Sequence, residues 1–270
     1  MRPGERALAI DWAAAEGWNP GLRDATAFGT VDPDGWLIAE VDGEPVGCIT
    51  ALRYDESFAF VGFYIVKPEH RGKGYGLALW EAAVRHVRGC NVGLDGVLAQ
   101  IDNYAKSGFA LDARNARYRG IGTRTATSGI VVVKDVDLAE IVAYDRICFP
   151  APRATFLRAW LSLPDLFSHV ARDGGAVVGY GTIRRCREGW KIGPLFANDA
   201  GVAIRLFDDL RSHADGEPVY LDVPTSNVAA LELATGAGME IVFETARMYT
   251  LGRPAYTAGR VFGVTSFELG

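Results

Sequence analysis

The sequence predicts an α/β or α+β fold that occurs twice along the chain. Two observations carry this prediction: short apolar runs alternate with amphipathic helical patterns, and stretches of the first half recur in the second half in the same order. A chain of 270 residues, 49% of them hydrophobic, can form one large domain or two modest ones. The internal repeat favours two domains.

The first elements are three strands. In GWLIAEVDGEPVGCITALRY, two strands should flank a tight turn at Asp42 and Gly43, because Asp-Gly supplies the positive φ angles that such a hairpin needs. The apolar run FAFVGFYIV follows as a third strand. Further strands are expected at residues 92–94 and in FALDARNARY, which would complete a unit that ends near Tyr118.

A helix is predicted between the third and fourth strands. In LALWEAAVRHV, apolar side chains recur at helical spacing and the charged side chains lie off that stripe. The predicted apolar stripe consists of Leu77, Trp80, Val84 and Val87. This pattern is typical of a helix that packs one face against a core.

The second half repeats landmarks of the first. GEPVGCITALRY is matched by GGAVVGYGTIRRC, NARY by TARMY, and AKSGF by ATGAGM, all at a nearly constant separation along the chain. These ordered matches predict a duplicated domain with its boundary in Gly120–Gly129, so that the domains span residues 1–122 and 123–270. The tail RVFGVTSFELG is expected to form a last strand on the second domain.

Composition argues against several classes of protein. No apolar run approaches the roughly 18 residues of a membrane span, and the N-terminus lacks a signal-peptide pattern, so we expect a cytoplasmic protein without a membrane partner. A net charge of −5 without a basic block argues against a nucleic-acid partner. The cysteines are far apart, which predicts neither a metal site nor disulfides but small buried apolar residues at Cys48, Cys90, Cys148 and Cys186.

The stretch FYIVKPEHRGKGYG leads from the third strand into the helix and predicts an anion-binding turn. A strand that enters a glycine-rich turn and then a helix directs backbone N–H groups and the positive end of the helix dipole to one point. Gly72, Gly74 and Gly76 would allow an anion to approach the backbone, while Arg71 and Lys73 add positive charge. Taken alone, the turn could equally be a simple connection between strand and helix.

The pattern in this turn is R-x-x-G-x-G, which differs from the signatures of P-loop and dinucleotide-binding proteins. It resembles the coenzyme A pyrophosphate loop of the GNAT superfamily of N-acetyltransferases, which Arg71, Gly74 and Gly76 match position by position. Downstream, YAKSGF resembles the end of a family helix whose tyrosine faces the coenzyme sulfur, and that residue is Tyr104 here. The chain departs from the family at Val97, where an asparagine is common.

The resemblance implies two tandem GNAT-like domains, each with a mixed, mostly antiparallel twisted sheet flanked by helices, and it implies acetyl-CoA as the cofactor. Tyr104 would be the general acid, although most tyrosines are packing residues with a hydrated hydroxyl group. The acceptor would bind near Trp18 and Asn19, in a segment that could also be a surface corner. The residues implied in binding coenzyme A are Phe63, Tyr64, Ile65, Val66, Arg71, Gly72, Lys73, Gly74, Tyr75 and Gly76.

The general base stays open at this point. Glu40, Asp95 and Asp102 are candidates by position, but each could be an ordinary solvated or turn carboxylate, and a chain of water molecules could serve instead. The mechanism that the resemblance implies is direct attack of a neutral amine on the thioester in a ternary complex. Such a mechanism needs no nucleophilic cysteine.

The second copy is expected to be degenerate. When the two copies are aligned, Asp199 stands in place of Gly72, and a carboxylate beside a diphosphate repels it. Ala234 stands in place of Tyr104, so the expected acid is missing as well. The asparagine common in the family is kept in this copy as Asn227, which suggests common descent followed by loss of the site.

Two functions are therefore considered. The first is an N-acyltransferase that moves an acetyl group from acetyl-CoA to a primary amine, carried by a small molecule or a peptide. The alternative is a non-catalytic acyl-CoA-binding sensor or interaction module. The oligomeric state is not predicted, although an internal duplication can replace a homodimer and is compatible with a monomer.

Overall fold

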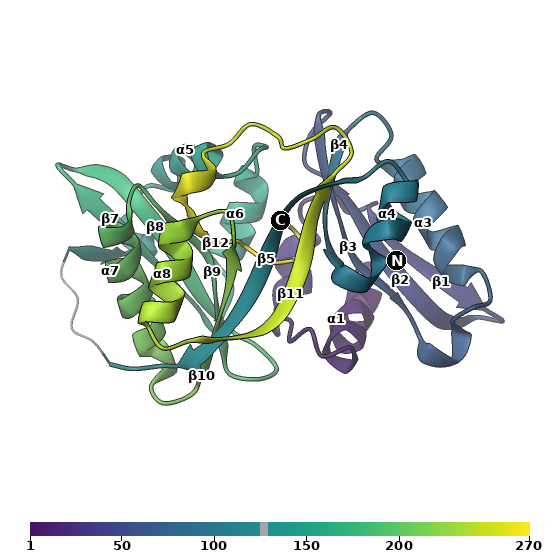
Figure 1. Ribbon diagram of the computed structural model, residues 1–270, viewed down its shortest axis with the longest axis horizontal. Helices are drawn as coiled ribbons and strands as arrows, with labels where there is room; N and C mark the ends of the chain where they lie inside the picture. Colours follow the sequence, from purple (N-terminus) through teal and green to yellow (C-terminus); the bar gives the residue numbers. More distant parts are fainter. Residues whose placement is uncertain (125–128) are drawn as a thin grey trace.

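Twelve strands form one continuous sheet in the computed structural model, which describes residues 1–124 and 129–270. The order across the sheet is β1-β2-β3-β4-β11-β5-β10-β9-β8-β7-β6, and β12 pairs with β9. Figure 1 shows the sheet running through both halves of the molecule. In chain order the strands are β1 (Trp36–Val41), β2 (Glu44–Arg53), β3 (Phe58–Val66), β4 (Asn91–Val97), β5 (Ala110–Ile121), β6 (Ile130–Val132), β7 (Leu166–Asp173), β8 (Ala176–Arg185), β9 (Trp190–Ala197), β10 (Pro218–Pro224), β11 (Glu240–Tyr249) and β12 (Val261–Gly263).

Helices connect these strands and cover the sheet. The α-helices of the described residues are α1 (Arg6–Ala15), α2 (Asp24–Phe28), α3 (Tyr75–His86), α4 (Ile101–Lys106), α5 (Leu138–Cys148), α6 (Ala154–Trp160), α7 (Ala200–Arg211) and α8 (Val228–Gly236). Short 3-10 helices are η1 (Pro3–Glu5), η2 (Pro68–His70), η3 (Leu98–Gln100), η4 (Val133–Asp135), η5 (Ser212–Ala214) and η6 (Ala258–Arg260). None of the helices described is long and apolar enough to cross a membrane.

The predicted hairpin and third strand are confirmed. β1 and β2 pair in antiparallel fashion around Asp42 and Gly43, whose φ angles of 52° and 83° are the positive values that the turn needs. β3 covers the run FAFVGFYIV. The four cysteines are buried, as predicted.

Helix α3 confirms the predicted helix, but its buried face differs from the predicted stripe. Trp80 is buried as expected, whereas Leu77 is 62% exposed and Val84 is 41% exposed. Leu79 and Ala83 pack in the core instead. Apolar residues extend around most of this helix, so their spacing alone did not identify the face that meets the sheet.

Both halves contain the same succession of elements, which confirms the tandem arrangement. The first half runs β1-β2-β3-α3-β4-α4-β5, and the second half runs β7-β8-β9-α7-β10-α8-β11. The boundary predicted in Gly120–Gly129 includes residues 125–128, which lie outside the described residues.

The two halves exchange their last strands. β5, from the first half, pairs on both sides with strands of the second half, β10 and β11. β11, from the second half, lies between β4 and β5 of the first half. Figure 1 shows β5 and β11 side by side at the centre of the molecule. Each half therefore needs the other to complete its sheet, and the division into residues 1–122 and 123–270 stays a prediction about the duplicated units.

A shared hydrophobic core joins the halves. Residues of α1 and α2 pack with residues of α5 and α6, and the rings of Phe28 and Trp160 stack with their centroids 5.8 Å apart. Two further cores lie under α3 in the first half and under α7 and α8 in the second half. The shared core fixes the position of one half on the other.

The C-terminal segment, residues 261–270, links both halves and is buried along its whole length. Only its first three residues form the predicted strand on the second half, as β12 beside β9, so the prediction was wrong for the rest of the tail. It then continues into the first half, where the Tyr54 hydroxyl group donates a hydrogen bond of 2.8 Å to the carbonyl oxygen of Leu269. Gly193 and Gly62 allow this passage, because a Cβ at either position would overlap the backbone of the segment.

Candidate active site

A cleft of about 710 Å³ opens in the first half where β3 and β4 separate. These parallel strands pair along residues 58–61 of β3 and then diverge. Just beyond this point Phe63 has a φ of 44°, a left-handed conformation that is unusual in a strand. The pairing of β3 with β2 shifts register nearby, so we interpret this feature as a β-bulge that directs β3 away from β4.

The structure places the four predicted strand residues, Phe63–Val66, in the wall of this cleft. Phe63 and Ile65 belong to the core shared by the two halves, while Tyr64 and Val66 pack with the core under α3. The Tyr64 ring lies 5.6 Å from that of Trp80. The cleft therefore has walls on both faces of the sheet.

The N-terminus of α3 and the glycine turn before it lie at one end of the cleft. Gly72 and Gly74 have φ angles of 74° and 88°, and a Cβ on either would point into open space, so their backbone is accessible. Gly74 is the N-cap residue, and no described side chain caps this helix, which leaves its first N–H groups for an anion. Gly76 has a different role: a Cβ there would lie 2.9 Å from the Tyr64 hydroxyl oxygen.

Positive charge accompanies this turn. The Nε atom of Arg71 donates a hydrogen bond of 2.8 Å to the Val66 carbonyl oxygen, and its guanidinium group pairs with Glu16. Half of the Arg71 side chain remains exposed. Lys73 is exposed and Tyr75 is half-buried. Accessible amides and positive charge together fit the pyrophosphate of coenzyme A.

Tyr104 lies on α4 beside the end of β4, and it lines the cleft. Gly96 of β4 makes room for the ring, because a Cβ there would overlap it, and the ring centroid lies 5.6 Å from that of Trp80. Burial, with a smaller contribution from Tyr64, raises the pKa of Tyr104 to about 12. The hydroxyl group therefore keeps its proton at neutral pH and can act as a donor.

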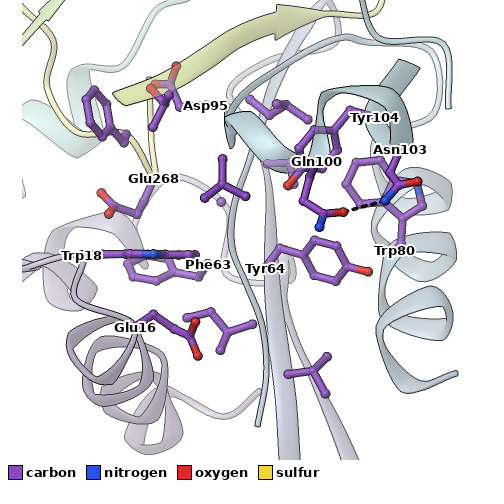
Figure 2. Close-up of a pocket in the computed structure, with 18 of the residues that line it drawn as sticks. Glu16, Trp18, Phe63, Tyr64, Trp80, Asp95, Gln100, Asn103, Tyr104 and Glu268 are labelled. Carbon is purple, nitrogen blue, oxygen red and sulfur yellow. Dashed lines mark hydrogen bonds between the residues drawn. The ribbon is translucent and has the colours of Figure 1, made fainter. Parts of the chain in front are cut away.

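The structure separates the two residues predicted near the acceptor. Trp18 lines the cleft on the side away from Tyr104, as Figure 2 shows, and its carbonyl oxygen accepts a hydrogen bond from Arg117. Asn19 turns toward the second half. Its side chain donates to the Glu188 carbonyl oxygen and accepts from the Glu188 N–H, both at 2.9 Å. Asn19 therefore holds the two halves together at this point.

Of the three candidate bases, Asp95 lines the cleft, whereas Glu40 and Asp102 lie on exposed surfaces of β1 and α4. The Asp95 carboxylate accepts hydrogen bonds from Arg247 at 2.6 and 2.8 Å and from Asn115 at 2.8 Å. Burial raises the pKa of Asp95, and the charge of Arg247 opposes this effect. A carboxylate fixed by three hydrogen bonds has little capacity left for a proton from a substrate.

The second half supplies part of the cleft wall, which the sequence analysis missed. Phe243 and Thr245 come from β11, and Phe267 and Glu268 come from the C-terminal segment. They reach the first half because β11 is exchanged and because the tail passes Gly62. One signal was present in the sequence: Glu268 is the single acidic residue in the tail VFGVTSFELG.

In the second half, the helix that corresponds to α3 is α7, and a side chain of the protein caps its N-terminus. Asp199 is the N-cap residue of α7, and its carboxylate accepts a hydrogen bond of 2.9 Å from the Val202 N–H. Asp199 thus caps α7, whereas Gly74 leaves α3 without a side-chain cap. The packing agrees with the alignment that matches Asp199 with Gly72, because Leu79 faces Gly47 as Leu206 faces Gly179, so α7 begins two residues earlier than α3. An aspartate at this position supplies the negative charge that a bound anion would bring.

The opening between β9 and β10 is also filled. β9 pairs with β10 along Trp190–Ile192, and farther along it pairs with β12 instead. Asn227, at the start of α8, donates hydrogen bonds to the carbonyl oxygens of Val261 at 2.9 Å and Gly259 at 3.2 Å. The tail of the chain therefore lies where the first half has its cleft.

Comparison with known proteins agrees with this geometry. Residues 6–109 match the model of the acetyltransferase (GNAT) family, and residues 141–263 match that of an acetyltransferase (GNAT) domain. The holothin acyltransferase of Pseudoalteromonas sp. (strain SANK 73390) is 34% identical over 266 residues, which cover 97% of this chain and 90% of that protein. The chain belongs to the GNAT family.

Solved structures share the fold of this GNAT protein. A protein from Pyrococcus horikoshii gives a TM-score of 0.84 at 22% identity, covering 100% of this chain and 94% of the other. A tandem GNAT protein from the clavulanic acid biosynthesis pathway gives a TM-score of 0.61 at 14% identity, covering 92% and 94%. The family matches and the relatives together support GNAT-type, acyl-CoA-dependent acyl transfer, and they favour it over a non-catalytic binding module.

Proposed function

We propose that the protein transfers an acetyl group from acetyl-CoA to a primary amine at one active site in the first half. The observation that carries this proposal is the cleft itself. It extends from Arg71 and Leu77 at the start of α3, past the proton-bearing Tyr104, to Trp18 on the opposite face of the sheet. One cavity can therefore hold a thioester on one side and an amine on the other.

Residues of the first half would hold the coenzyme. The turn from Arg71 to Gly76 would bind the pyrophosphate through its N–H groups and through the charges of Arg71 and Lys73. Beyond Val61, β3 has no ladder with β4, so those N–H groups of Phe63–Val66 that do not bond to β2 are in a suitable place to bind the pantetheine arm and the thioester oxygen. Tight binding of that oxygen would favour attack on the thioester carbon.

The reaction then needs one proton donor on the coenzyme side. A C–N bond forms between the amine and the acetyl group, the C–S bond breaks, and the departing thiolate takes the proton of the Tyr104 hydroxyl group. A covalent enzyme intermediate is unnecessary. The nearby cysteine in β2 is unsuited to forming one, since burial raises the pKa of Cys48 to about 12.

A small-molecule acceptor fits the other end of the cleft. Four aromatic side chains lie there and would cover a compact apolar body: Trp18, Phe63, Phe243 and Phe267. The relative that spans 97% of this chain is named for the acylation of holothin, which also favours a small molecule over a peptide.

Release of coenzyme A thiol in the presence of different amines tests the proposal. The panel should contain an arylalkylamine such as 2-phenylethylamine, a polyamine such as spermidine, and a peptide with a free N-terminus, and a reaction without amine measures background hydrolysis. We expect turnover with at least one small amine. Tight binding of acetyl-CoA without turnover of any amine would contradict the proposal and favour the binding module.

A further inference from the structure

Glu268 differs from the other buried carboxylates of the protein. Its side chain lines the cleft, and the residue is only 4% exposed. No described cation lies within ion-pair distance of it, and its carboxylate accepts a hydrogen bond from the Ser266 hydroxyl group. The buried aspartates each pair with an arginine: Asp24 with Arg184, Asp145 with Arg153, and Asp222 with Arg117.

A buried carboxylate without a cation is unfavourable for folding, because burial removes its hydration without an opposing charge. A buried carboxylate of this kind in a cleft is a candidate functional group. Glu268 faces a cleft that a substrate can enter, so the cation can come from outside the protein. A protonated amine has the required charge.

The position of Glu268 agrees with the acceptor end of the cleft. Figure 2 shows Glu268 on the same side of the cleft as Trp18, across from Tyr104. The neighbouring Phe267 packs against Arg117, whose guanidinium carbon lies 4.9 Å from the ring centroid. Arg117 bonds to Asp222 at 2.6 and 2.7 Å and acts on Glu268 only through space, without a hydrogen bond or ion pair to it.

Contacts with the first half fix the backbone of the tail on both sides of Glu268. Gly62 precedes the bulged residue of β3, and a side chain there would collide with the backbone of Glu268. The hydrogen bond between Tyr54 and the carbonyl oxygen of Leu269 fixes the chain immediately after Glu268. The tail of the second half therefore places one carboxylate in the site of the first half, and residues of the first half flank it.

We propose that Glu268 binds the ammonium group of the acceptor and receives the proton that the amine must lose. This inference rests on the proposed function. The amine loses one proton to Glu268, the C–N bond forms and the C–S bond breaks, and Tyr104 supplies the proton of the free thiol. Solvent then removes the proton from Glu268 and returns one to Tyr104, so that both residues regain their starting states.

Other charged groups influence Glu268 from several elements, and each of them bonds to another residue. Asp95 on β4 is bonded to Arg247. Arg117 on β5 and Arg184 on β8 are paired with aspartates, and Lys191 on β9 donates a hydrogen bond of 2.8 Å to the Asn19 carbonyl oxygen. None of these described groups forms a hydrogen bond or ion pair with the Glu268 carboxylate, so they act on it only through space.

The test is single-turnover acetyl transfer by Glu268→Gln across a range of pH, with the best amine from the panel. We expect the rate at neutral pH to fall by about 10²-fold, the usual effect of a lost proton acceptor. The remaining rate should increase about tenfold per pH unit until the free amine predominates, because the enzyme then depends on amine that is already neutral. Coenzyme A affinity should change less than twofold.

Glu244→Gln is the matched control, because Glu244 is a half-buried carboxylate on β11 between two residues that line the cleft. It should retain the wild-type rate and pH profile. An unchanged rate and profile in Glu268→Gln would overturn the inference, as would a rate loss that merely follows lower melting temperature or weaker coenzyme binding. If the wild-type protein acetylates no amine, the proposed function itself fails, and the two failures are thereby distinguished.

Discussion

The two halves of this protein share a fold but differ at two equivalent places. These are the start of the helix after the third strand of each half and the space beside the end of that strand. In the first half, α3 starts at Gly74 without a side-chain cap, and β3 and β4 separate around an open cleft. In the second half, Asp199 caps α7 and β12 occupies the space beside β9. Both halves therefore contain a helix start and a strand end in equivalent positions. In the first half these positions are open to an anion and a pantetheine arm, whereas in the second half other residues of the chain occupy them.

This difference suggests a role for the second copy other than binding coenzyme A. Its tail, which fills the opening of its own half, continues to the first half and contributes Phe267 and Glu268 there. Its last strand, β11, adds Phe243 and Thr245. We propose that the degenerate copy shapes the acceptor side of the site in the intact copy.

The largest effect is expected from closing the first anion site with Gly74→Val. A branched side chain at a φ of 88° strains the turn and covers the N–H groups, so coenzyme A affinity should fall by about 100-fold or more. Calorimetric titration measures this change. Gly252→Val is the matched control, because Gly252 has a φ of 79° in open space in a distant loop. Equal affinity losses in both variants would mean that strain, and not the turn, is responsible.

A second comparison concerns Tyr104, whose counterpart in the sequence alignment is the buried Ala234. Tyr104→Phe removes only the hydroxyl group, so folding and coenzyme A affinity should persist, while single-turnover acetyl transfer should slow by about 10²-fold. An unchanged single-turnover rate would show that Tyr104 is a packing residue.

The pH dependence gives Tyr104 a further test. Its pKa is raised to about 12, so the proton-bearing form should persist well above the ordinary tyrosine pKa of about 10. In the wild-type protein, any loss of rate caused by ionisation of Tyr104 should therefore begin above pH 10 and should be missing from Tyr104→Phe. A loss that is centred below pH 10 and vanishes in the variant would contradict the burial of this group.

The smallest effect is expected from loosening the tail with Asn227→Ala. This change removes the N-cap of α8 and two hydrogen bonds to the segment around β12, so the free energy of unfolding should fall by about 1–3 kcal/mol. Asp137→Ala is the control, because it removes an N-cap from α5 and leaves the tail bonds intact. Denaturant unfolding should show the larger loss in Asn227→Ala, and equal losses would mean that these bonds do not anchor the tail.

Local patterns in the sequence predicted much of the first half. Asp42 and Gly43 marked a turn because their backbone preference is local, and the glycines before α3 marked a turn with positive φ angles for the same reason, while anion binding there stays a prediction. The tyrosine at position 104 was found through its resemblance to a family motif. These predictions depend on residues that are close together in the chain.

The remaining features depend on contacts between distant segments. Whether β5 pairs with its own half or with the other is decided by strands more than a hundred residues away, and no local pattern records that choice. Asn19 lies next to Trp18 in the chain, yet it bonds to Glu188 of the second half. Glu268 becomes a candidate only when the path of the tail is known.

The number of coenzyme A molecules bound per chain tests the central claim most directly. Titration calorimetry of the wild-type protein should give one site, because Asp199 and β12 fill the equivalent place in the second half, and Gly74→Val should remove that site. Two equivalent sites, or coenzyme A bound at residues 198–203 in a crystal structure, would contradict the account.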